Sequence, residues 1–259
     1  MKKKIRFPTI SLGSEPDQPD IEELTEFIRS HKSYEGDLIT FKHLRSLKAQ
    51  QGASISSPCT GGLFCLPRIQ EAFPFPSEKQ NPDASNLIAD ATMITQLAGS
   101  IYAALPAPHQ VVGPSGTADD EIFADYCDQY AALLRDMRDV HIRGHILHAK
   151  EIQPIELELL TSKKTRFLIP EGDLTIQEEL LEHQKELIIT NKQVSLIAEL
   201  IDQYEIRSLI IIEPDKDGFH LALEIMDPDQ ISAGGYGNGN EQAYWGMIAS
   251  IAEASVNQD

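Results

Sequence analysis

The chain has 259 residues, and its 22 Lys and Arg against 40 Asp and Glu give a formal net charge of −18. With 41% hydrophobic residues it is close to the soluble globular average, which excludes collagen-like, mucin-like and disulfide-framework proteins. The acidic balance argues against a nucleic acid or an anionic membrane as partner, because both are bound mainly through Lys and Arg. We therefore expect a folded protein whose partner is a small molecule.

The most apolar stretch, residues 87–105, is interrupted by Asp90 and other polar side chains, so it predicts a buried helix rather than a membrane span. The basic start of the chain is followed by Pro8 instead of an apolar run, which argues against a secretion signal. An odd number of cysteines favours a reducing compartment, and we expect a cytoplasmic protein. The three cysteines are Cys59, Cys65 and Cys127.

The N-terminal part has an irregular pattern of apolar residues. It predicts a strand at residues 5–12, a helix at 19–31, short strands at 38–41 and 110–113, and a long helix at 118–139.

From about residue 140 onwards, short apolar runs alternate with amphipathic runs, which is typical of βα units and a parallel sheet. The predicted strands are residues 143–149, 166–170, 186–190, 207–212 and 231–234. One predicted helix begins at Pro154. The others cover residues 174–184, 192–204, 217–226 and 240–255.

Eight strands with interleaved helices predict a (β/α)₈-type barrel, which typically takes about 250 residues. Residues 50–108 fit this repeat poorly, since they hold an apolar helix and two Pro-rich stretches. We interpret them as a helical and Pro-rich insertion after the second strand, within a single α/β domain that covers residues 1–259. The alternative is an open doubly wound parallel sheet, which the same pattern would serve.

In both architectures ligands bind at the carboxyl ends of the parallel strands, which directs the search to the residues after each strand. Glu213 directly continues the apolar strand 207–212 and begins an acidic turn. A carboxylate held at a strand end suits acid/base chemistry, so Glu213 is a candidate catalytic residue. The alternative is a solvated turn that caps the next helix through Asp217.

A glycine-rich run follows the last predicted strand and precedes a helix. Glycines let the backbone approach a ligand, and the helix N-terminus offers unpaired N–H groups to an anion. The candidate ligand-binding residues here are Gly234, Gly235, Gly237 and Asn238. The run matches neither a dinucleotide nor a P-loop fingerprint, and its alternative reading is a flexible turn with Asn240 as a helix N-cap.

His148 and Lys150 end the strand 143–149 and are further candidate catalytic residues. Asn191 and Lys192 follow the strand 186–190 and are candidate ligand-binding residues. A zinc site would need His148 on one helix face with the two histidines before it, but Gly144 favours a strand, whose alternate side chains point to opposite faces. We expect no metal site, and the sequence indicates no particular cofactor.

Two short segments resemble a known group of enzymes. Residues 12–16, Leu-Gly-Ser-Glu-Pro, and residues 112–114, Val-Gly-Pro, with Ala118, are similar to the G-S-x-P and G-P-x-T-x-A segments of the cobalamin-independent methionine synthase and uroporphyrinogen decarboxylase barrels. The resemblance implies a (β/α)₈ fold that acts on methyl donors or tetrapyrrole carboxylates. The chain departs from the pattern at Ser115 and Gly116, and it lacks the His-x-Cys pair that such methyltransferases use for zinc. The resemblance therefore supports the barrel more than any reaction.

Two functions remain open at this point. The first is a barrel-type enzyme, a lyase or a transferase, that acts on a small anionic metabolite bearing phosphate or carboxylate. The second is a non-catalytic binding or assembly protein on an α/β scaffold, which the absence of a specific catalytic fingerprint favours.

Overall fold

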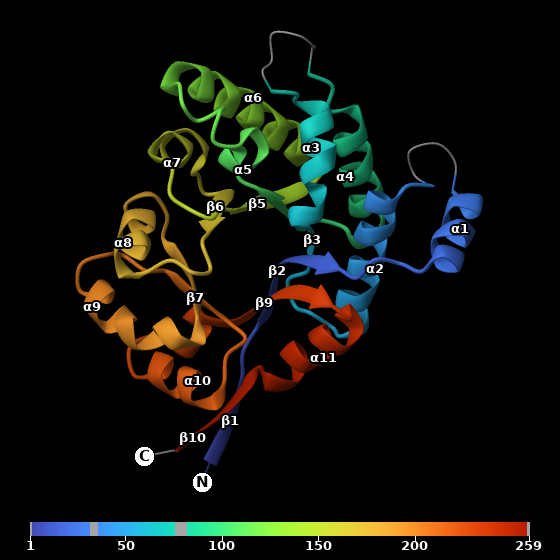
Figure 1. The fold of residues 1–259 in the computed structure, drawn as a ribbon. Coiled ribbons are helices and arrows are strands. Elements are labelled where there is room, and N and C mark those ends of the chain that lie inside the picture. The colour runs from blue at the N-terminus through green and yellow to red at the C-terminus, as the bar shows by residue number, and fades with distance from the viewer. Residues whose placement is uncertain (1, 32–35, 76–81, 258–259) are drawn as a thin grey trace.

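The computed structural model describes residues 2–31, 36–75 and 82–257. Within these residues, eight strands form a ring with helices around its outside (Figure 1). The strands of the ring are β2 (Thr9–Pro16), β3 (Cys59–Gly61), β4 (Ile101–Pro106), β5 (Ile142–His148), β6 (Thr165–Leu168), β7 (Glu186–Thr190), β8 (Ser208–Ile212) and β9 (Ile231–Gly239). A separate antiparallel ribbon joins β1 (Lys2–Arg6) to β10 (Glu253–Asn257).

The ring consists of two four-stranded parallel sheets, in the orders β3-β4-β5-β6 and β2-β9-β8-β7. At the β2–β3 junction, Ser57 exchanges two backbone hydrogen bonds with β2, at 2.9 Å to Thr9 and 3.0 Å to Ser11. At the β6–β7 junction a side chain takes the place of the ladder. The amide of Gln184 accepts from the Phe167 N–H at 2.8 Å and donates to the carbonyls of Phe167 and Glu186 at 3.2 and 2.9 Å. The fold is thus a (β/α)₈-type barrel, as the sequence predicts.

The helices pack around the ring and cap themselves with short polar side chains. The side chains of Asp37, Asp119, Asp173 and Asn240 accept hydrogen bonds from first-turn N–H groups, as N-cap residues commonly do. The α-helices are α1 (Ile21–Ser30), α2 (Leu38–Gly52), α3 (Leu66–Ala72), α4 (Ser85–Ala98), α5 (Pro108–Val112), α6 (Asp120–Asp139), α7 (Pro154–Leu160), α8 (Leu174–His183), α9 (Ile197–Ile201), α10 (Lys216–Leu223) and α11 (Glu241–Ile251). None of the helices described in the structure is long and apolar enough to cross a membrane.

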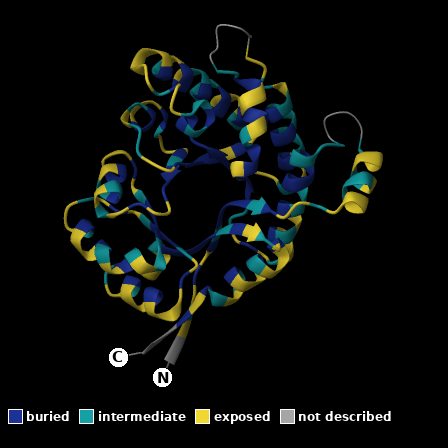
Figure 2. Ribbon diagram, in the orientation of Figure 1, coloured by how far each residue is buried: buried dark blue, intermediate teal, exposed yellow. Residues whose placement is uncertain are grey.

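Apolar side chains fill both sides of the ring, whose strands are buried (Figure 2). Inside it, Leu12, Ile146 and Ile210 from three different strands belong to one buried cluster. Larger clusters lie between the strands and the helices. The barrel is therefore a packed core, and ligand space is left at its ends.

Two predicted strands are wrong. Residues 38–41 begin α2, because Asp37 caps a helix there and its side chain accepts the Thr40 N–H at 2.8 Å. Residues 110–113 end α5, because Pro108 starts a helix at a position where its missing N–H costs nothing. The second and third strands of the ring, β3 and β4, instead lie inside residues 50–108, so this segment supplies part of the barrel wall and is not only a helical and Pro-rich insertion. Residues 76–81 of the segment lie outside the described residues.

The glycine-rich run is a strand rather than a loop, since β9 extends from Ile231 to Gly239. A Cβ atom at Gly234 would lie 2.5 Å from Ile210, and one at Gly235 would lie 2.9 Å from the Tyr244 hydroxyl. The glycines thus allow β9 to pack closely against β8 and α11. The helix predicted at 192–204 is also split, into a 3₁₀ helix at Asn191–Leu196 and α9.

Candidate functional site

A pocket of about 350 Å³ opens at the carboxyl ends of β5 and β6. It is lined by Leu63, Gln110, His148, Ala149, Lys150, Ile169, Pro170 and Glu171. These residues follow β3, β4, β5 and β6, so the pocket is at the end of the barrel where enzymes of this fold carry their active sites.

His148, the last residue of β5, forms the inner wall of the pocket. Its Nε2 lies 2.7 Å from the carbonyl oxygen of Leu12 on β2. A carbonyl only accepts, so Nε2 carries the hydrogen and Nδ1 is left as an acceptor. Burial lowers the pKa of His148 to about 4, and the bond to Leu12 opposes this only partly. The imidazole is therefore neutral at pH 7.

The backbone around His148 is held by residues that follow β4. The His148 carbonyl accepts from the Ala107 N–H at 2.7 Å and from the side-chain amide of Gln110. The adjacent His109 is fixed in turn by Glu156 of α7, whose carboxylate accepts the backbone N–H at 2.5 Å and lies 2.9 Å from Nδ1. Both members of this pair are buried, so α5 and α7 form a rigid frame for the pocket.

Lys150 and Glu171 place opposite charges on the same pocket. Lys150 is exposed two residues after the end of β5, and Glu171 is exposed beyond β6. No ion pair joins either of them to another residue that the structure describes. Both charges are thus available to a ligand.

Tyr236 of β9 lies behind His148 and Leu63. Its ring centroid is 4.7 Å from that of His148, and its hydroxyl accepts the Leu63 N–H at 3.1 Å. Burial raises the pKa of Tyr236, which keeps the hydroxyl protonated. Tyr236 thus contacts two residues that line the pocket.

Glu213, the third predicted catalytic residue, is not among the residues that line the pocket. It follows β8 with a left-handed backbone, φ 49°, and its carboxylate accepts from the Tyr244 hydroxyl at 2.9 Å. The Tyr244 hydroxyl also accepts the backbone N–H of Tyr236 at 2.9 Å. Glu213 thus reaches the pocket only through two tyrosines.

None of the six predicted ligand-binding residues lines the pocket. They lie in β9 or directly after β7, whereas the pocket is built at the ends of β3 to β6. Gly234, Gly235 and Gly237 are buried in β9, and Asn238 is exposed near its end. Asn191 accepts the Asp215 N–H at 3.2 Å and so supports the turn after β8. Lys192 is exposed in the 3₁₀ helix after β7.

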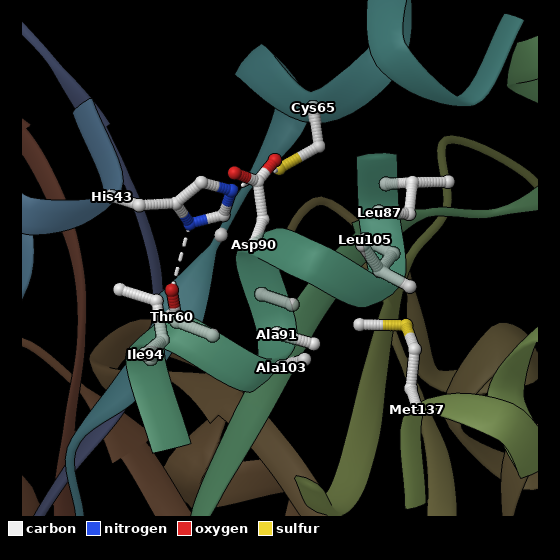
Figure 3. Close-up of a pocket in the computed structure, with 12 residues that line it drawn as sticks. His43, Thr60, Cys65, Leu87, Asp90, Ala91, Ile94, Ala103, Leu105 and Met137 are labelled. Carbon is white, nitrogen blue, oxygen red and sulfur yellow. Dashed lines mark hydrogen bonds between the residues drawn. The ribbon is translucent and has the colours of Figure 1, made fainter. Parts of the chain in front are cut away.

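A second hollow of only about 20 Å³ lies outside the ring, between the wall strands and α2 and α4 (Figure 3). His43 is bonded there to Thr60 through Nδ1 at 2.7 Å, and Cys65 and Asp90 lie close to its ring. Burial lowers the pKa of His43 to about 4 and raises that of the Cys65 thiol to about 12. The size of the hollow suits one water molecule. We assign a structural role to the cluster of His43, Cys65 and Asp90.

The zinc that the family resemblance implies has no matching donors in the part of the chain that the structure describes. No three His, Cys, Asp or Glu side chains are grouped there so that they could hold a metal ion. All three cysteines are buried and unpaired, and burial raises the pKa of each thiol. In the metal-free chain these thiols are therefore protonated.

Sequence reasoning found His148 and Lys150 because β5 was recognised as a strand. It missed Leu63 and Gln110 as lining residues, since the strands before them were not recognised. The available signals were Pro108, which marks a helix start, and the apolar residues 101–105 before it.

No protein-family model and no curated protein sequence matches this chain. Solved structures do. A B12-independent methionine synthase from a Shewanella species, in complex with selenomethionine, is similar with a TM-score of 0.61 and 12% sequence identity over 96% of each chain. A putative vitamin-B12-independent methionine synthase from Listeria monocytogenes has a TM-score of 0.63 and 12% identity over 92% of this chain and 93% of that chain. The resemblance predicted from the two short segments is thus confirmed at the level of the fold.

Proposed function

We propose that this chain is a barrel-type enzyme that binds a small anionic metabolite in the pocket lined by His148 and Lys150. The observation that carries the proposal is the position of this pocket, which opens at the carboxyl ends of the strands and brings together two of the three predicted catalytic residues. The similar solved structures support a barrel enzyme, since both are methionine synthases by their descriptions.

Lys150 supplies the positive charge that an anionic ligand needs. The chain as a whole carries a net charge of −18, so attraction must come from a local cation. Lys150 is at the pocket and without an ion-pair partner among the described residues, while Glu171, which follows the neighbouring strand β6, would orient a ligand that also carries a hydrogen-bond donor. A fixed cation of this kind also stabilises negative charge that develops during a reaction.

His148 supplies an acceptor of fixed direction. Because its Nε2–H is committed to Leu12, its Nδ1 accepts a proton or a hydrogen bond. Its pKa of about 4 makes it a weak base at neutral pH, so its contribution is to orient a donor group of the substrate and to take a proton only from a strongly acidified one.

A thermal-shift screen tests this assignment, because a ligand that binds the native state raises the melting temperature. The probes are phosphorylated metabolites, carboxylates and folates, measured on the parent, on Lys150→Met and on Lys192→Met. Lys192 is the matched control, since it is also exposed but does not line the pocket. We expect an anionic compound to stabilise the parent and Lys192→Met, and to lose most of its effect on Lys150→Met.

Equal stabilisation of both lysine variants would place the anion elsewhere and refute the site. A ligand that binds at Lys150 but is recovered unchanged after long incubation would favour the non-catalytic binding protein instead. In that case His148→Gln would leave binding of compounds without a donor group unaffected.

A further inference from the structure

The contact between His148 and Tyr236 crosses the barrel. In the ring order β2, β3, β4, β5, β6, β7, β8, β9, the strands β5 and β9 are four positions apart, and Figure 1 shows them on opposite sides. Two side chains from opposite walls approach to 4.7 Å between ring centroids only if both point along the same diameter. The Tyr236 ring thus packs against the His148 ring from the opposite wall.

Two glycines on other strands make room for this tyrosine. A Cβ atom at Gly13 of β2 would lie 3.2 Å from the Tyr236 ring, and one at Gly62 after β3 would lie 2.9 Å from its hydroxyl. Gly13 has φ +108°, a conformation that glycine adopts without strain, and the β2 register shifts between Ser11 and Ser14. Both glycines therefore leave space beside the Tyr236 side chain, although each added Cβ atom would meet another atom first, Ala104 Cβ at 2.5 Å and the Ser14 carbonyl oxygen at 1.9 Å.

Hydrogen bonds hold Tyr236 at both ends. Its hydroxyl accepts from Leu63 N–H at 3.1 Å, and its backbone N–H donates to the Tyr244 hydroxyl at 2.9 Å, which itself donates to Glu213. Leu63 and His148 both line the pocket, so Tyr236 contacts two of its walls without lining it.

We propose that Tyr236 is a positioning residue of this site, because its ring packs against the His148 ring and its hydroxyl accepts the Leu63 N–H, so that one side chain supports two residues that line the pocket. We call this support the floor of the site. The inference rests on the proposed function for its ligand.

The test removes the floor and supplies a substitute. In Tyr236→Ala, water and small molecules reach the space behind His148, so its pKa rises from about 4 toward the ordinary value of about 6.5. Phenol, which has the size of the lost side chain, should stabilise Tyr236→Ala and return the pKa of His148 to a low value. The His148 ring signal is followed by proton NMR against pH, with His148→Gln to assign it.

Three further variants keep the result interpretable. Tyr236→Leu opens the floor with a smaller loss of apolar volume, and it should raise the His148 pKa even if Tyr236→Ala does not fold. Tyr236→Phe keeps the ring and should leave the pKa low and phenol without effect. Tyr102→Ala removes a tyrosine on β4 that packs against the same inner cluster next to Arg143 and Arg166, and it should leave His148 unchanged.

An unchanged His148 pKa in both Tyr236→Ala and Tyr236→Leu would overturn the proposal. So would phenol that stabilises the parent as much as Tyr236→Ala. Neither readout uses a substrate, so failure of the anion screen on Lys150 variants and failure of this floor are separate results.

Discussion

The two sheets of the barrel differ in regularity and in content. In the regular half, β7, β8 and β9 follow one another in a short βα repeat, and β2 pairs with β9. The pocket half, β3 to β6, begins with a three-residue strand and a connection of irregular helices, yet all the residues that line the pocket follow its strands. The candidate pocket thus lies in the half where the βα repeat is irregular.

The halves also differ in their buried polar groups. Arg68, Asp90 and the histidines His43, His145 and His148 are buried on or against the pocket half. His220, which follows β8 in the regular half, is exposed. Three substitutions and one change of pH test whether this contrast holds.

The largest effect is expected from Arg68→Ala. The Arg68 side chain is 4% exposed and bridges Asp37 and Asp90, with Asp90 at 3.5 Å. Its loss leaves the Asp90 carboxylate buried without a counter-charge, which costs about 3–5 kcal/mol in the free energy of unfolding. Urea unfolding measures this. Arg207→Ala in the regular half removes an exposed bridge to Glu205 and should cost at most about 1 kcal/mol. Equal losses in the two variants would contradict the contrast.

The second largest effect is expected from acid, which should destabilise the pocket half. Burial lowers the pKa of His43 and His148 to about 4 and that of His145 to about 3. The unfolded chain therefore binds these protons first, and stability is lost as the pH falls from about 6.5 toward 4. For His43 and His148, a pKa lowered from 6.5 to about 4 corresponds to about 3 kcal/mol at most.

Asp90 acts in the opposite direction, since burial raises its pKa to about 6 and the folded state gains stability as the pH falls below that value. One such carboxyl does not offset three histidines, so a net loss between pH 7 and 4.5 is expected in urea titrations. His145→Leu should flatten the curve, because neither ring nitrogen of His145 has a hydrogen-bond partner in the structure. A parent curve that rises toward pH 4.5 would show that the histidines are not buried as described.

The third change addresses the junction between the halves. Gln184→Ala removes the three hydrogen bonds that join β6 to β7 and leaves buried backbone groups unpaired, at a cost of about 2–3 kcal/mol. Gln203→Ala, which loses one exposed bond to Glu199, is the matched control and should change stability by less than about 0.5 kcal/mol. If the two variants have the same melting temperature, Gln184 does not hold the barrel closed.

The smallest effect is a gain in the regular half. Gly246 is an exposed residue within α11, and a Cβ atom there would meet nothing within 4 Å. Gly246→Ala should raise the free energy of unfolding by about 0.5–1 kcal/mol through helix propensity alone. Gly62→Ala should do the reverse, because its Cβ would lie 1.9 Å from the Ser14 carbonyl oxygen. A destabilised Gly246→Ala would mean that α11 packs more tightly than described.

The same contrast explains what could be predicted from the sequence. The strands β5 to β8 are apolar runs bounded by turn residues, and all four were predicted within a few residues. The three-residue β3 gives no periodic signal, and the apolar residues of β4 were merged with the preceding α4 into one buried helix. Glycines are rare in strands, so β9 was predicted too short and its glycines were assigned to a ligand loop.

The predicted site residues depend on which strands can be predicted from the sequence. Five of the nine predicted site residues, namely Glu213, Gly234, Gly235, Gly237 and Asn238, belong to β9 or the turn after β8, although β9 is longer than the predicted strand. His148 and Lys150 were found because β5 is equally clear. Tyr236 could not be found, since its role depends on a contact with the opposite wall and on glycines more than 170 residues away in the chain.

The hydrogen bonds of the Gln184 side chain at the β6–β7 junction have a consequence for the motion of the barrel. A backbone ladder opens only when several residues move together, whereas a single amide releases its partners by rotating about two side-chain bonds. The Phe167 N–H should therefore exchange with deuterium sooner than the N–H groups of Leu147 or Ile189 on the neighbouring strands. A ring that closes in this way can widen on one side without unfolding, and the side in question is next to the lip formed by Ile169, Pro170 and Glu171.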